Sequence, residues 1–420
     1  MAYFILGRSG SGKSELLHRY IKEMPEGKNA VLIVPEQSSF QNEKKLLDNI
    51  GAKKAKFTEV LSFKRLCNHI FDQYKGITEQ RIDDGIKAVL MSMAIENAPA
   101  EGGVLELYKS SGKRNLKRTM DLVEPMLVAV NEYKMCLITP EQLSETAKTV
   151  ENKVLAAKLR DSARIYAAYN ALLENSYADP DDDLTKLYDI LGENNYFQGM
   201  YVFIDSFSGF SAQEFRIIER IFSQAEEVYI SLCCDRETLN NENSIFAEPD
   251  MTYRTLLRLA QKTGQKCNII EPETEGIRFQ TDALKAIEKG IFHGYRISRN
   301  DPGKKRVTSE NDGSVELYEA SDLYDEVSYT AEKIYTLVHE HGYKYSDIEI
   351  IARSFDSYKS VIVSEFPKYH IPYFLSNPEC LENKALIRLM LSAFDVIQSA
   401  LDTEAVKRIE KTFLTPQEEE

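Results

Sequence analysis

The 420-residue sequence lacks several patterns that would assign it to a protein class at once. It contains no long uncharged apolar run, which excludes a transmembrane helix. The first residues enter an apolar segment directly, so we expect no signal peptide before the fold. An excess of basic residues is also missing, because the formal net charge is −14. This charge argues against a basic protein surface, but it is compatible with a local basic groove that binds nucleic acid.

The spacing of cysteine and histidine favours neither a disulfide framework nor a metal site. No Cys-x-x-Cys pair occurs, and the six histidines lack the spacing of metal ligands. The neighbouring residues Cys233 and Cys234 lie in an apolar, strand-like run, so we predict that they are buried. Reduced thiols of this kind are typical of a cytoplasmic protein. The six cysteines are Cys67, Cys136, Cys233, Cys234, Cys267 and Cys380.

A Gly-rich loop between a strand-like and a helix-like segment is the clearest functional pattern. Residues 3–6 (YFIL) are apolar, and the helical pattern begins at Glu15. A phosphate-binding P-loop requires this context, because backbone N–H groups converge on phosphate oxygens at the positive end of the helix. Lys13 is expected to reach the outer phosphates and the Ser14 hydroxyl to hold Mg²⁺. The predicted nucleotide-binding residues are Gly7, Arg8, Ser9, Gly10, Ser11, Gly12, Lys13 and Ser14. The alternative is a Gly/Ser turn that matches by chance, which is expected in roughly one such chain in a hundred.

Several apolar runs predict a parallel α/β sheet around this loop. The expected strands are 29–34, 56–61, 201–204 and 228–232. Asp205 follows the third of these, which is the Walker B arrangement, in which the carboxylate reaches Mg²⁺. The alternative is an ordinary turn residue after a buried strand. The polar loop 35–41 should lie beside the P-loop, because the carboxyl ends of parallel strands form the ligand crevice.

The tract that begins at Ser62 has two interpretations. Ser62, Phe63, Lys64 and Arg65 combine a hydroxyl, an aromatic ring and two cations, a mixture that suits a platform for single-stranded nucleic acid. The same residues also fit the start of a helix whose Phe63 and Leu66 pack inward, and from the residues alone we favour that helix.

Residues from about 80 to 191 have a helical pattern, which predicts a helical insertion into the α/β domain. One helix is expected over 87–96 and another over 116–134. Thr139, Pro140 and Gln142 signal the start of a further helix. The densest basic cluster lies at 109–118, although a charged run is usually only a solvated face.

A second α/β unit is predicted after a loop-like segment at 299–314. Its expected strands are 315–318, 348–353 and 371–374, and a helix capped by Ser321 lies between the first two. This unit does not close a sheet before residue 420, so we expect that the sequence is cut off.

The order of these segments resembles the AddB family, also called RexB. Members of this family are the second subunit of a bacterial ATP-dependent helicase–nuclease that processes double-strand DNA breaks, with AddA as partner. The likeness covers nearly the whole chain, although the family's proteins are much longer. The segments that carry it are GRSGSGKS (7–14), VPEQSSFQNE (34–43), LSFKRL (61–66), YVFIDSFSGFSAQEF (201–215), YSDIEIIARSFDSY (345–358) and YHIPYF (369–374).

The resemblance implies an α/β fold of RecA-like domains, as in UvrD-type helicases. Domain 1A would comprise 1–79 and 197–298, the helical insertion 80–196, the linker 299–314, and the start of domain 2A 315–420. ATP and Mg²⁺ are the implied cofactors. Lys13, Asp205 and Arg353 match catalytic positions, with Arg353 approaching the γ-phosphate. Segments that contact DNA are matched by Ser38, Ser39, Phe40, Ser62, Phe63 and Arg65. The family's nuclease domain, with its iron–sulfur cysteines, would lie in the missing C-terminal part.

The sequence departs from active helicases of this type at two places. Ser206 follows Asp205 where those enzymes carry the Glu that activates the attacking water, and only Glu36 or Glu214 offers a substitute. The segment after the next strand also lacks the Gly-Asp-x-x-Gln pattern. Three hypotheses therefore stay open: an ATP- and DNA-binding region with little or no hydrolysis, a competent DNA-stimulated motor, and a P-loop kinase of a small metabolite.

Overall fold

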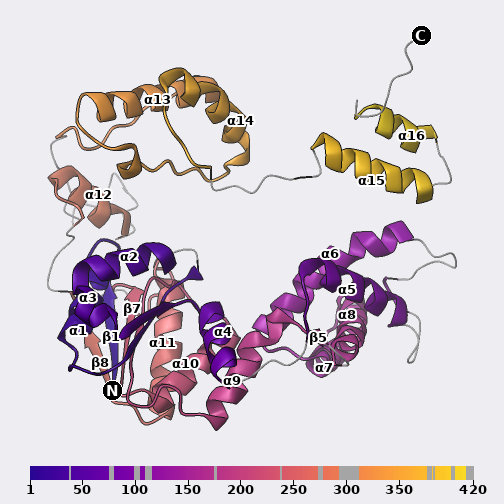
Figure 1. Cartoon of the computed structure of the whole chain (residues 1–420), viewed down its shortest axis with the longest axis horizontal. Coiled ribbons are helices and arrows are strands. Elements are labelled where there is room, and N and C mark those ends of the chain that lie inside the picture. The colour runs from indigo at the N-terminus through magenta and orange to yellow at the C-terminus, as the bar shows by residue number, and fades with distance from the viewer. Residues whose placement is uncertain are drawn as a thin grey trace. The chain divides into compact units, whose positions relative to one another are not determined.

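The computed structural model describes residues 1–36, 39–74, 80–98, 105–108, 116–174, 177–236, 239–272, 278–292, 312–375, 381, 384–398 and 403–412. Contacts between residues divide the chain into two compact units, Met1–Val315 and Glu316–Glu420 (Figure 1). Most of the predicted linker, residues 299–311, lies outside the described residues. Among the described residues, no helix is long and apolar enough to cross a membrane.

The first unit is built on a six-stranded sheet whose paired strands all run parallel. This arrangement confirms the predicted α/β class. In spatial order the strands are β3 (Thr58–Leu61), β2 (Ala30–Ile33), β6 (Tyr201–Ile204), β7 (Glu227–Cys233), β1 (Ala2–Gly7) and β8 (Cys267–Ile270).

Helices cover both faces of the sheet, because alternate residues of each strand are apolar on both sides (Figure 1). In β6, Val202 and Ile204 join one core and Phe203 joins the other. The first core includes α4 (Phe63–Tyr74), α9 (Asp183–Glu193), α10 (Ala212–Gln224) and α11 (Ala247–Lys262). The second includes α1 (Lys13–Glu23) and α2 (Ser39–Ile50). The short helix α3 (Ala52–Ala55) precedes β3, and α12 (Asp282–Phe292) follows β8.

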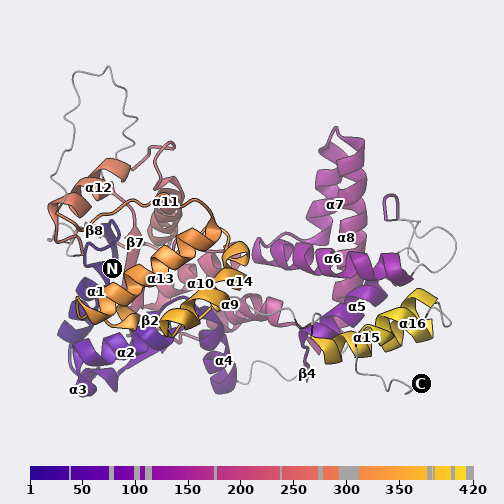
Figure 2. The same ribbon diagram turned by 90° about the horizontal axis from the view of Figure 1, so that it is seen from above.

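The predicted helical insertion forms a block with its own hydrophobic core (Figure 2). Its helices are α5 (Asp84–Asn97), α6 (Leu116–Met135), α7 (Pro140–Thr149) and α8 (Lys153–Leu173). The capping box of Thr139 and Gln142 is present at the start of α7. The basic cluster falls outside the described residues or on side chains that are not described.

The junction between the insertion and the sheet is marked by a pair of short parallel strands, β4 (Gln80–Arg81) and β5 (Tyr177–Ala178). The 3₁₀ turn η2 (Pro180–Asp182) follows β5 and leads into α9. Helix α9 lies inside the range predicted for the insertion, yet its Leu187 and Leu191 belong to the core of the sheet. The insertion therefore ends near residue 178, because α9 buries its apolar face against α4 and α10.

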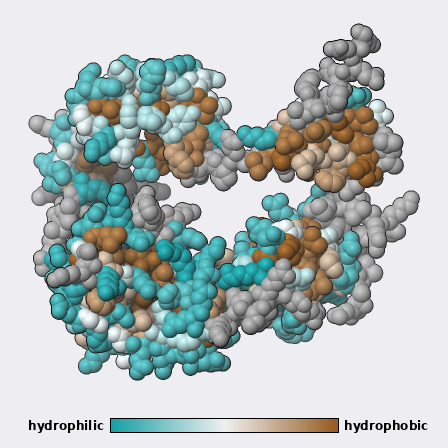
Figure 3. Space-filling view, in the orientation of Figure 1, coloured by the Kyte–Doolittle hydropathy of each residue, from teal (hydrophilic) through white to brown (hydrophobic). Residues whose placement is uncertain are grey.

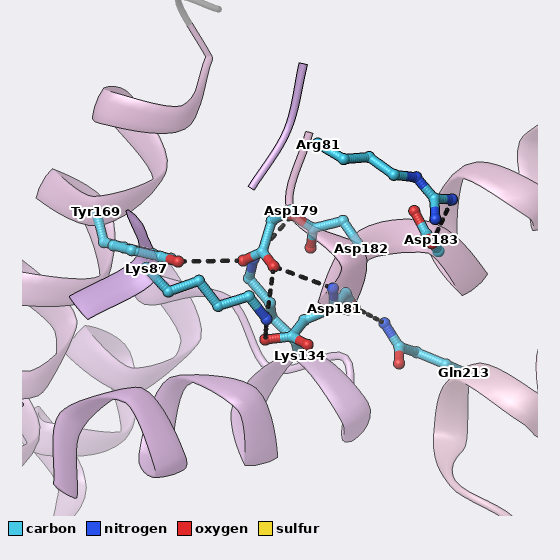
Figure 4. Close-up of polar contacts among 9 residues, drawn as sticks. All are labelled: Arg81, Lys87, Lys134, Tyr169, Asp179, Asp181, Asp182, Asp183 and Gln213. Atoms are coloured by element: carbon cyan, nitrogen blue, oxygen red, sulfur yellow. Dashed lines mark hydrogen bonds and ion pairs between the residues drawn. The ribbon is translucent and has the colours of Figure 1, made fainter. Parts of the chain in front are cut away.

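A cluster of ion pairs connects the elements at this junction (Figure 4). The side chain of Lys134 is 3% exposed, and its Nζ lies 2.7 Å from Oδ2 of Asp179 and 2.8 Å from Oδ2 of Asp182. Lys87 bridges Asp179 and Asp181 from α5, at 3.1 and 2.8 Å. We call these five residues the junction cluster. Because they come from α5, α6 and the segment formed by η2 and its N-cap Asp179, they tie the insertion to the segment that enters the sheet domain.

The second unit has helices where they were predicted but not strands. Helix α13 (Leu323–His339) packs against α14 (Asp356–Glu365) and the turn η5 (Phe366–Tyr369). The turn η4 (Tyr345–Asp347) lies between α13 and α14. In the described part of this unit the segments 315–318, 348–353 and 371–374 form no strand pairs, so the three predicted strands are wrong. A strand forms only where a neighbouring strand pairs with its backbone N–H and C=O groups. These segments lack such pairing, and their side chains Leu317, Ile351 and Phe374 are exposed.

The start of α13 corrects a further prediction. Its N-cap is Asp322, which accepts from Asp325 N, while Ser321 binds the Asp325 carboxylate. Beyond it, α15 (Ala385–Gln398) and α16 (Thr403–Glu410) contact each other. Figure 3 shows a hydrophobic patch over α15. Its exposed side chains are Leu386, Met390, Leu391, Phe394 and Ile397.

Candidate nucleotide-binding site

The Gly-rich loop leaves the end of β1 and enters α1 at Lys13. Gly10 and Gly12 have φ angles of 79° and 85°, in the left-handed region that glycine adopts without a steric penalty. Gly12 is the N-cap of α1, so the unpaired N–H groups of the first turn begin beside the loop. A side chain at Gly10 would also collide with Arg278, because its Cβ would lie 2.8 Å from that of Arg278. The local structure therefore matches the predicted P-loop.

Lys13 points back over its own loop. Its Nζ donates to the carbonyl oxygens of Gly7 and Arg8, both at 2.8 Å. Burial lowers the pKa of the Lys13 ammonium, since few water molecules can reach it. A bound phosphate would replace the two neutral carbonyls with charged oxygens, which form stronger hydrogen bonds with an ammonium.

Ser14 and Asp205 form the second part of the site. The Ser14 hydroxyl donates to Oδ2 of Asp205 at 2.7 Å. Asp205 directly follows β6 and is only 3% exposed. Two neighbouring ligands of an octahedral Mg²⁺ lie roughly 3 Å apart, because each Mg–O bond is about 2.1 Å long. A hydroxyl and a carboxylate oxygen at this spacing fit Mg²⁺, which prefers oxygen ligands.

These residues line a pocket of about 660 Å³ at the carboxyl edge of the sheet. Helix α2 contributes Lys45, and a cation from beyond β8, Arg278, lies across the loop. Arg278 Nη1 donates to Ser9 Oγ at 3.3 Å, and its backbone N–H donates to Gly10 O at 3.4 Å. The pocket therefore gathers three cations around the loop, as a polyphosphate ligand requires.

Arg8 belongs to the predicted P-loop, but its side chain binds acidic residues instead of lining this pocket. Its Nε lies 2.9 Å from Oδ2 of Asp235, and its Nη1 lies 3.2 Å from Oε1 of Glu288. These contacts tie the loop to the segment after β7 and to α12. The side chain of Arg8 thus supports the loop, and only its backbone remains a candidate for phosphate binding.

The loop after Asp205 carries no carboxylate that faces the nucleotide pocket. Ser206 has a φ of 67°, which is unusual for a residue with a side chain. Of the two alternative acids, Glu214 accepts from the backbone N–H of Ser211 at 2.7 Å and closes the capping box of α10. Burial raises the pKa of Glu214. Both Glu36 and Glu214 line a neighbouring pocket of about 300 Å³ and not the pocket of Lys13.

The residues predicted to contact DNA lie in two segments, one at the start of α2 and one at the start of α4. Ser38 lies outside the described residues, and for Ser39 and Phe40 only their place at the start of α2 is described. Ser62 is buried, and its Oγ accepts from the backbone N–H of Arg65 at 3.2 Å.

Phe63 corrects the prediction of a base-stacking ring. It is buried, and its ring centroid lies 5.7 Å from that of Phe207 and 6.3 Å from that of Phe210. The helix-start interpretation of this tract is thus confirmed, and Phe63 has no free face for a base. Lys64 and Arg65 are exposed beside it.

Arg353, the predicted arginine of the second unit, is exposed. It lines a cavity of about 870 Å³ within that unit, among apolar side chains such as Ile334 and Phe366. Its approach to a nucleotide stays a prediction.

Sequence reasoning did not assign several residues that line this pocket, among them His18, Lys45, Ser231 and Arg278. His18 is buried on α1 and lies 2.8 Å from the amide of Asn49 on α2. Ser231 interrupts an apolar strand, which is a signal for a buried polar function. Arg278 and Lys45 follow no motif, because the packing of distant segments brings them to the loop.

Comparison with known proteins shows which family this chain resembles. The family model described as "ADDB, N-terminal" matches residues 4–288, and the model "UvrD-like helicase C-terminal domain" matches residues 279–417. A protein of Clostridium acetobutylicum is 33% identical over 97% of this chain and 34% of its own length. Proteins of Clostridium tetani and a Thermoanaerobacter species are 30% and 29% identical over 98% of this chain and 35% of theirs.

All three relatives are named as the B subunit of an ATP-dependent helicase/deoxyribonuclease. The chain spans about a third of the length of these relatives. The second match supports a RecA-like architecture, and the described strands of the first unit form a parallel α/β sheet that is compatible with it. Since the first model covers more than half of the sequence, the chain belongs to the family described as ADDB, N-terminal.

Proposed function

We propose that this chain is the ATP- and DNA-binding, helicase-like region of a helicase–nuclease subunit that acts in the recombinational repair of double-strand DNA breaks. The observation that carries the proposal is the meeting of Lys13, Ser14 and Asp205 in one pocket. Family membership and the names of the relatives agree with it.

In this proposal Mg²⁺–ATP occupies the 660 Å³ pocket. Lys13, Arg278 and the backbone N–H groups of the loop hold the phosphates, and Ser14 with Asp205 holds the metal. When bound, Mg²⁺ supplies charge neutralisation at the phosphates. Arg353 stays a candidate for contact with the γ-phosphate through the family resemblance alone.

ATP hydrolysis by this region alone is proposed to be weak or absent. Water must be oriented and deprotonated for attack on the γ-phosphate, and active enzymes use a positioned residue for this step. Here Ser206 occupies that place in the sequence, and Glu214 is engaged in the cap of α10. Nucleotide binding would then stabilise one conformation of the region, and it would not power movement along DNA.

DNA binding is proposed at the exposed cations that follow β3. Lys64 and Arg65 are exposed, whereas Phe63 beside them is buried. Exposed cations supply most of the affinity of a protein for a phosphate backbone. Ser38, Ser39 and Phe40 remain candidates through the family resemblance. Lys64 lines the neighbouring 300 Å³ pocket, whose other charged residues are Glu36, Asp181, Asp183 and Glu214. Because the pocket is mainly acidic, DNA should pass over its rim and not enter it.

The remaining proposals rest on the likeness to the longer relatives. An AddA-type subunit is the proposed partner, in a heterodimer that binds duplex ends and single strands. An iron–sulfur cluster is assigned to the C-terminal nuclease part and to none of the cysteines here. The proposed location is the cytoplasm, where ATP and chromosomal DNA are found and thiols stay reduced.

The proposal is tested by measuring ATP binding, single-stranded DNA binding and ATP turnover on the same preparation. We expect both ligands to bind, DNA affinity to fall steeply with salt, and turnover to stay negligible with or without DNA. The control is Lys13→Ala, which should lose nucleotide binding and keep DNA binding.

The other outcomes identify the alternatives. DNA-stimulated turnover that disappears in Lys13→Ala would show a competent motor. Turnover that needs a small metabolite and ignores DNA would show a kinase. Failure of the wild-type protein to bind nucleotide would refute the proposal.

A further inference from the structure

Ser231 is a buried hydroxyl in the middle of an apolar strand. It is 3% exposed and lies in β7, between Ile230 and Leu232. Its Oγ donates a hydrogen bond to Oδ1 of Asp205. Burying a hydroxyl is unfavourable unless it finds a partner, and Asp205 is the partner here.

The pairing of the strands explains why these two side chains meet. In the register of β6 and β7, Ile204 lies opposite Ile230, so Asp205 and Ser231 are the next residues along the two strands. Ile204, Ile230 and Leu232 all point into the core that contains α10. Because side chains alternate, Asp205 and Ser231 point to the other face, on which α1 carries Ser14.

Asp205 is consequently held by a hydroxyl at each oxygen. Ser14 binds Oδ2 at 2.7 Å and Ser231 binds Oδ1. The two hydroxyls differ in their surroundings, because Ser14 belongs to the Gly-rich loop and the helix start that follows it, and Ser231 to a central strand of the sheet. Ser231 therefore fixes the rotation of the Asp205 carboxylate. Oδ2 is then the oxygen that can hold Mg²⁺ together with the Ser14 hydroxyl.

We propose that Ser231 is a positioning residue that sets the Mg²⁺ affinity of the nucleotide site by orienting Asp205. This inference rests on the proposed nucleotide function. Mg²⁺ requires near-ideal octahedral geometry, so a carboxylate that can rotate is a poorer ligand than a fixed one. Removing a group that orients a metal ligand typically lowers metal affinity about 10- to 100-fold.

The matched pair Ser231→Thr and Ser231→Val tests this role. The two replacements have nearly the same shape and suit a strand, but only Thr keeps the hydroxyl. A fluorescent ATP analogue is titrated at increasing Mg²⁺ and, separately, in EDTA. Mg²⁺ should raise the affinity for the analogue, and the Mg²⁺ midpoint is the concentration that gives half of the maximal increase. We expect this midpoint to rise about tenfold or more in Ser231→Val and to stay near wild type in Ser231→Thr. Affinity in EDTA should be equal in both variants.

Two controls separate this role from a general loss of structure. Ser223→Ala changes an exposed serine on α10 and should leave the Mg²⁺ midpoint unchanged. In an Asp205→Ala background, Ser231→Val should cause little further change, because the orienting hydrogen bond has lost its acceptor. Thermal melts confirm that each variant is folded.

An unchanged Mg²⁺ midpoint in folded Ser231→Val would overturn the inference. Equal losses of affinity with Mg²⁺ and in EDTA would also overturn it, since they would show a purely structural role. If Ser231→Val fails to fold, a Ser231→Ala variant is measured in the same way. Failure of the wild-type protein to bind the analogue at all would instead refute the proposed function.

Discussion

The Ser14 hydroxyl lies 2.7 Å from Oδ2 of Asp205, although 191 residues separate the two in the sequence. The helical insertion and α9 occupy most of that interval, yet β6 pairs in register with β2 and β7 and returns Asp205 to the edge of the sheet where α1 begins. The parallel sheet is thus what assembles the site, and the insertion is an addition to it.

Phe63 and Arg65 should respond in opposite ways to substitution. Phe63→Ala should lower the free energy of unfolding by about 3–5 kcal/mol, because it leaves a cavity beside Phe207 and Phe210. Arg65→Ala should leave stability within about 0.5 kcal/mol, since Arg65 is exposed, but should weaken binding to single-stranded DNA and reduce its salt dependence. Urea unfolding and DNA titration at two salt concentrations measure both effects. A stable Phe63→Ala variant with impaired DNA binding would reinstate the base-stacking interpretation.

The junction cluster should be important for the stability of the first unit. Lys134→Met removes one partner from Asp179 and Asp182, whose carboxylates lie 2.7 and 2.8 Å from the ammonium. Breaking a buried ion pair on one side costs about 3–5 kcal/mol, and we expect the lower end of this range because Asp179 keeps its ion pair with Lys87. Lys148→Met is the matched control, since its pair with Glu145 is exposed and should contribute about 1 kcal/mol at most. Similar unfolding midpoints for the two variants would contradict the role of the cluster.

His18 should make the stability of the first unit sensitive to acid. Burial lowers the pKa of His18 below its ordinary value of 6.5, so at mildly acidic pH the unfolded chain binds a proton that the folded chain does not. Stability should therefore fall as the pH drops through 6.5 toward the folded-state pKa, and change little from this group above that range. Urea unfolding of the wild type and His18→Gln at pH 7.5 and 5.5 measures the effect.

The acid-dependent loss should be smaller in His18→Gln. The control is His341→Gln, because His341 is exposed and its replacement should leave the pH dependence as it is. Equal losses in wild type and His18→Gln would show that other groups cause the acid sensitivity.

The sequence predicts the first unit well because its signals are local. The β-branched runs, the glycines at 10 and 12, and the capping boxes at Thr139 and Ser211 each determine the structure of a few neighbouring residues. The three expected strands of the second unit fail for the opposite reason. Apolar alternation predicts a strand, but a strand forms only where another backbone pairs with it, and pairing depends on distant segments.

The same limit applies to the site. Lys13, Ser14 and Asp205 follow motifs and could be identified from the sequence. Arg278 and Ser231 could not be assigned a role, because one depends on how the chain folds back over the loop and the other on the register of β6 and β7. Phe63 shows the converse: its residue type suits DNA, and only its burial reveals a structural role.

The central claim is that the Gly-rich loop binds Mg²⁺–nucleotide through Lys13. Calorimetric titration of a slowly hydrolysed ATP analogue with Mg²⁺ into the wild type, Lys13→Ala and Lys22→Ala tests it most directly, since Lys22 is an exposed lysine on the same helix. We predict wild-type affinity for Lys22→Ala and a loss of about 10- to 100-fold or more for Lys13→Ala, because hydrogen bonds to charged groups contribute about 1.5–3 kcal/mol each. Circular dichroism should show that all three proteins are equally folded. Wild-type affinity in Lys13→Ala would contradict the account.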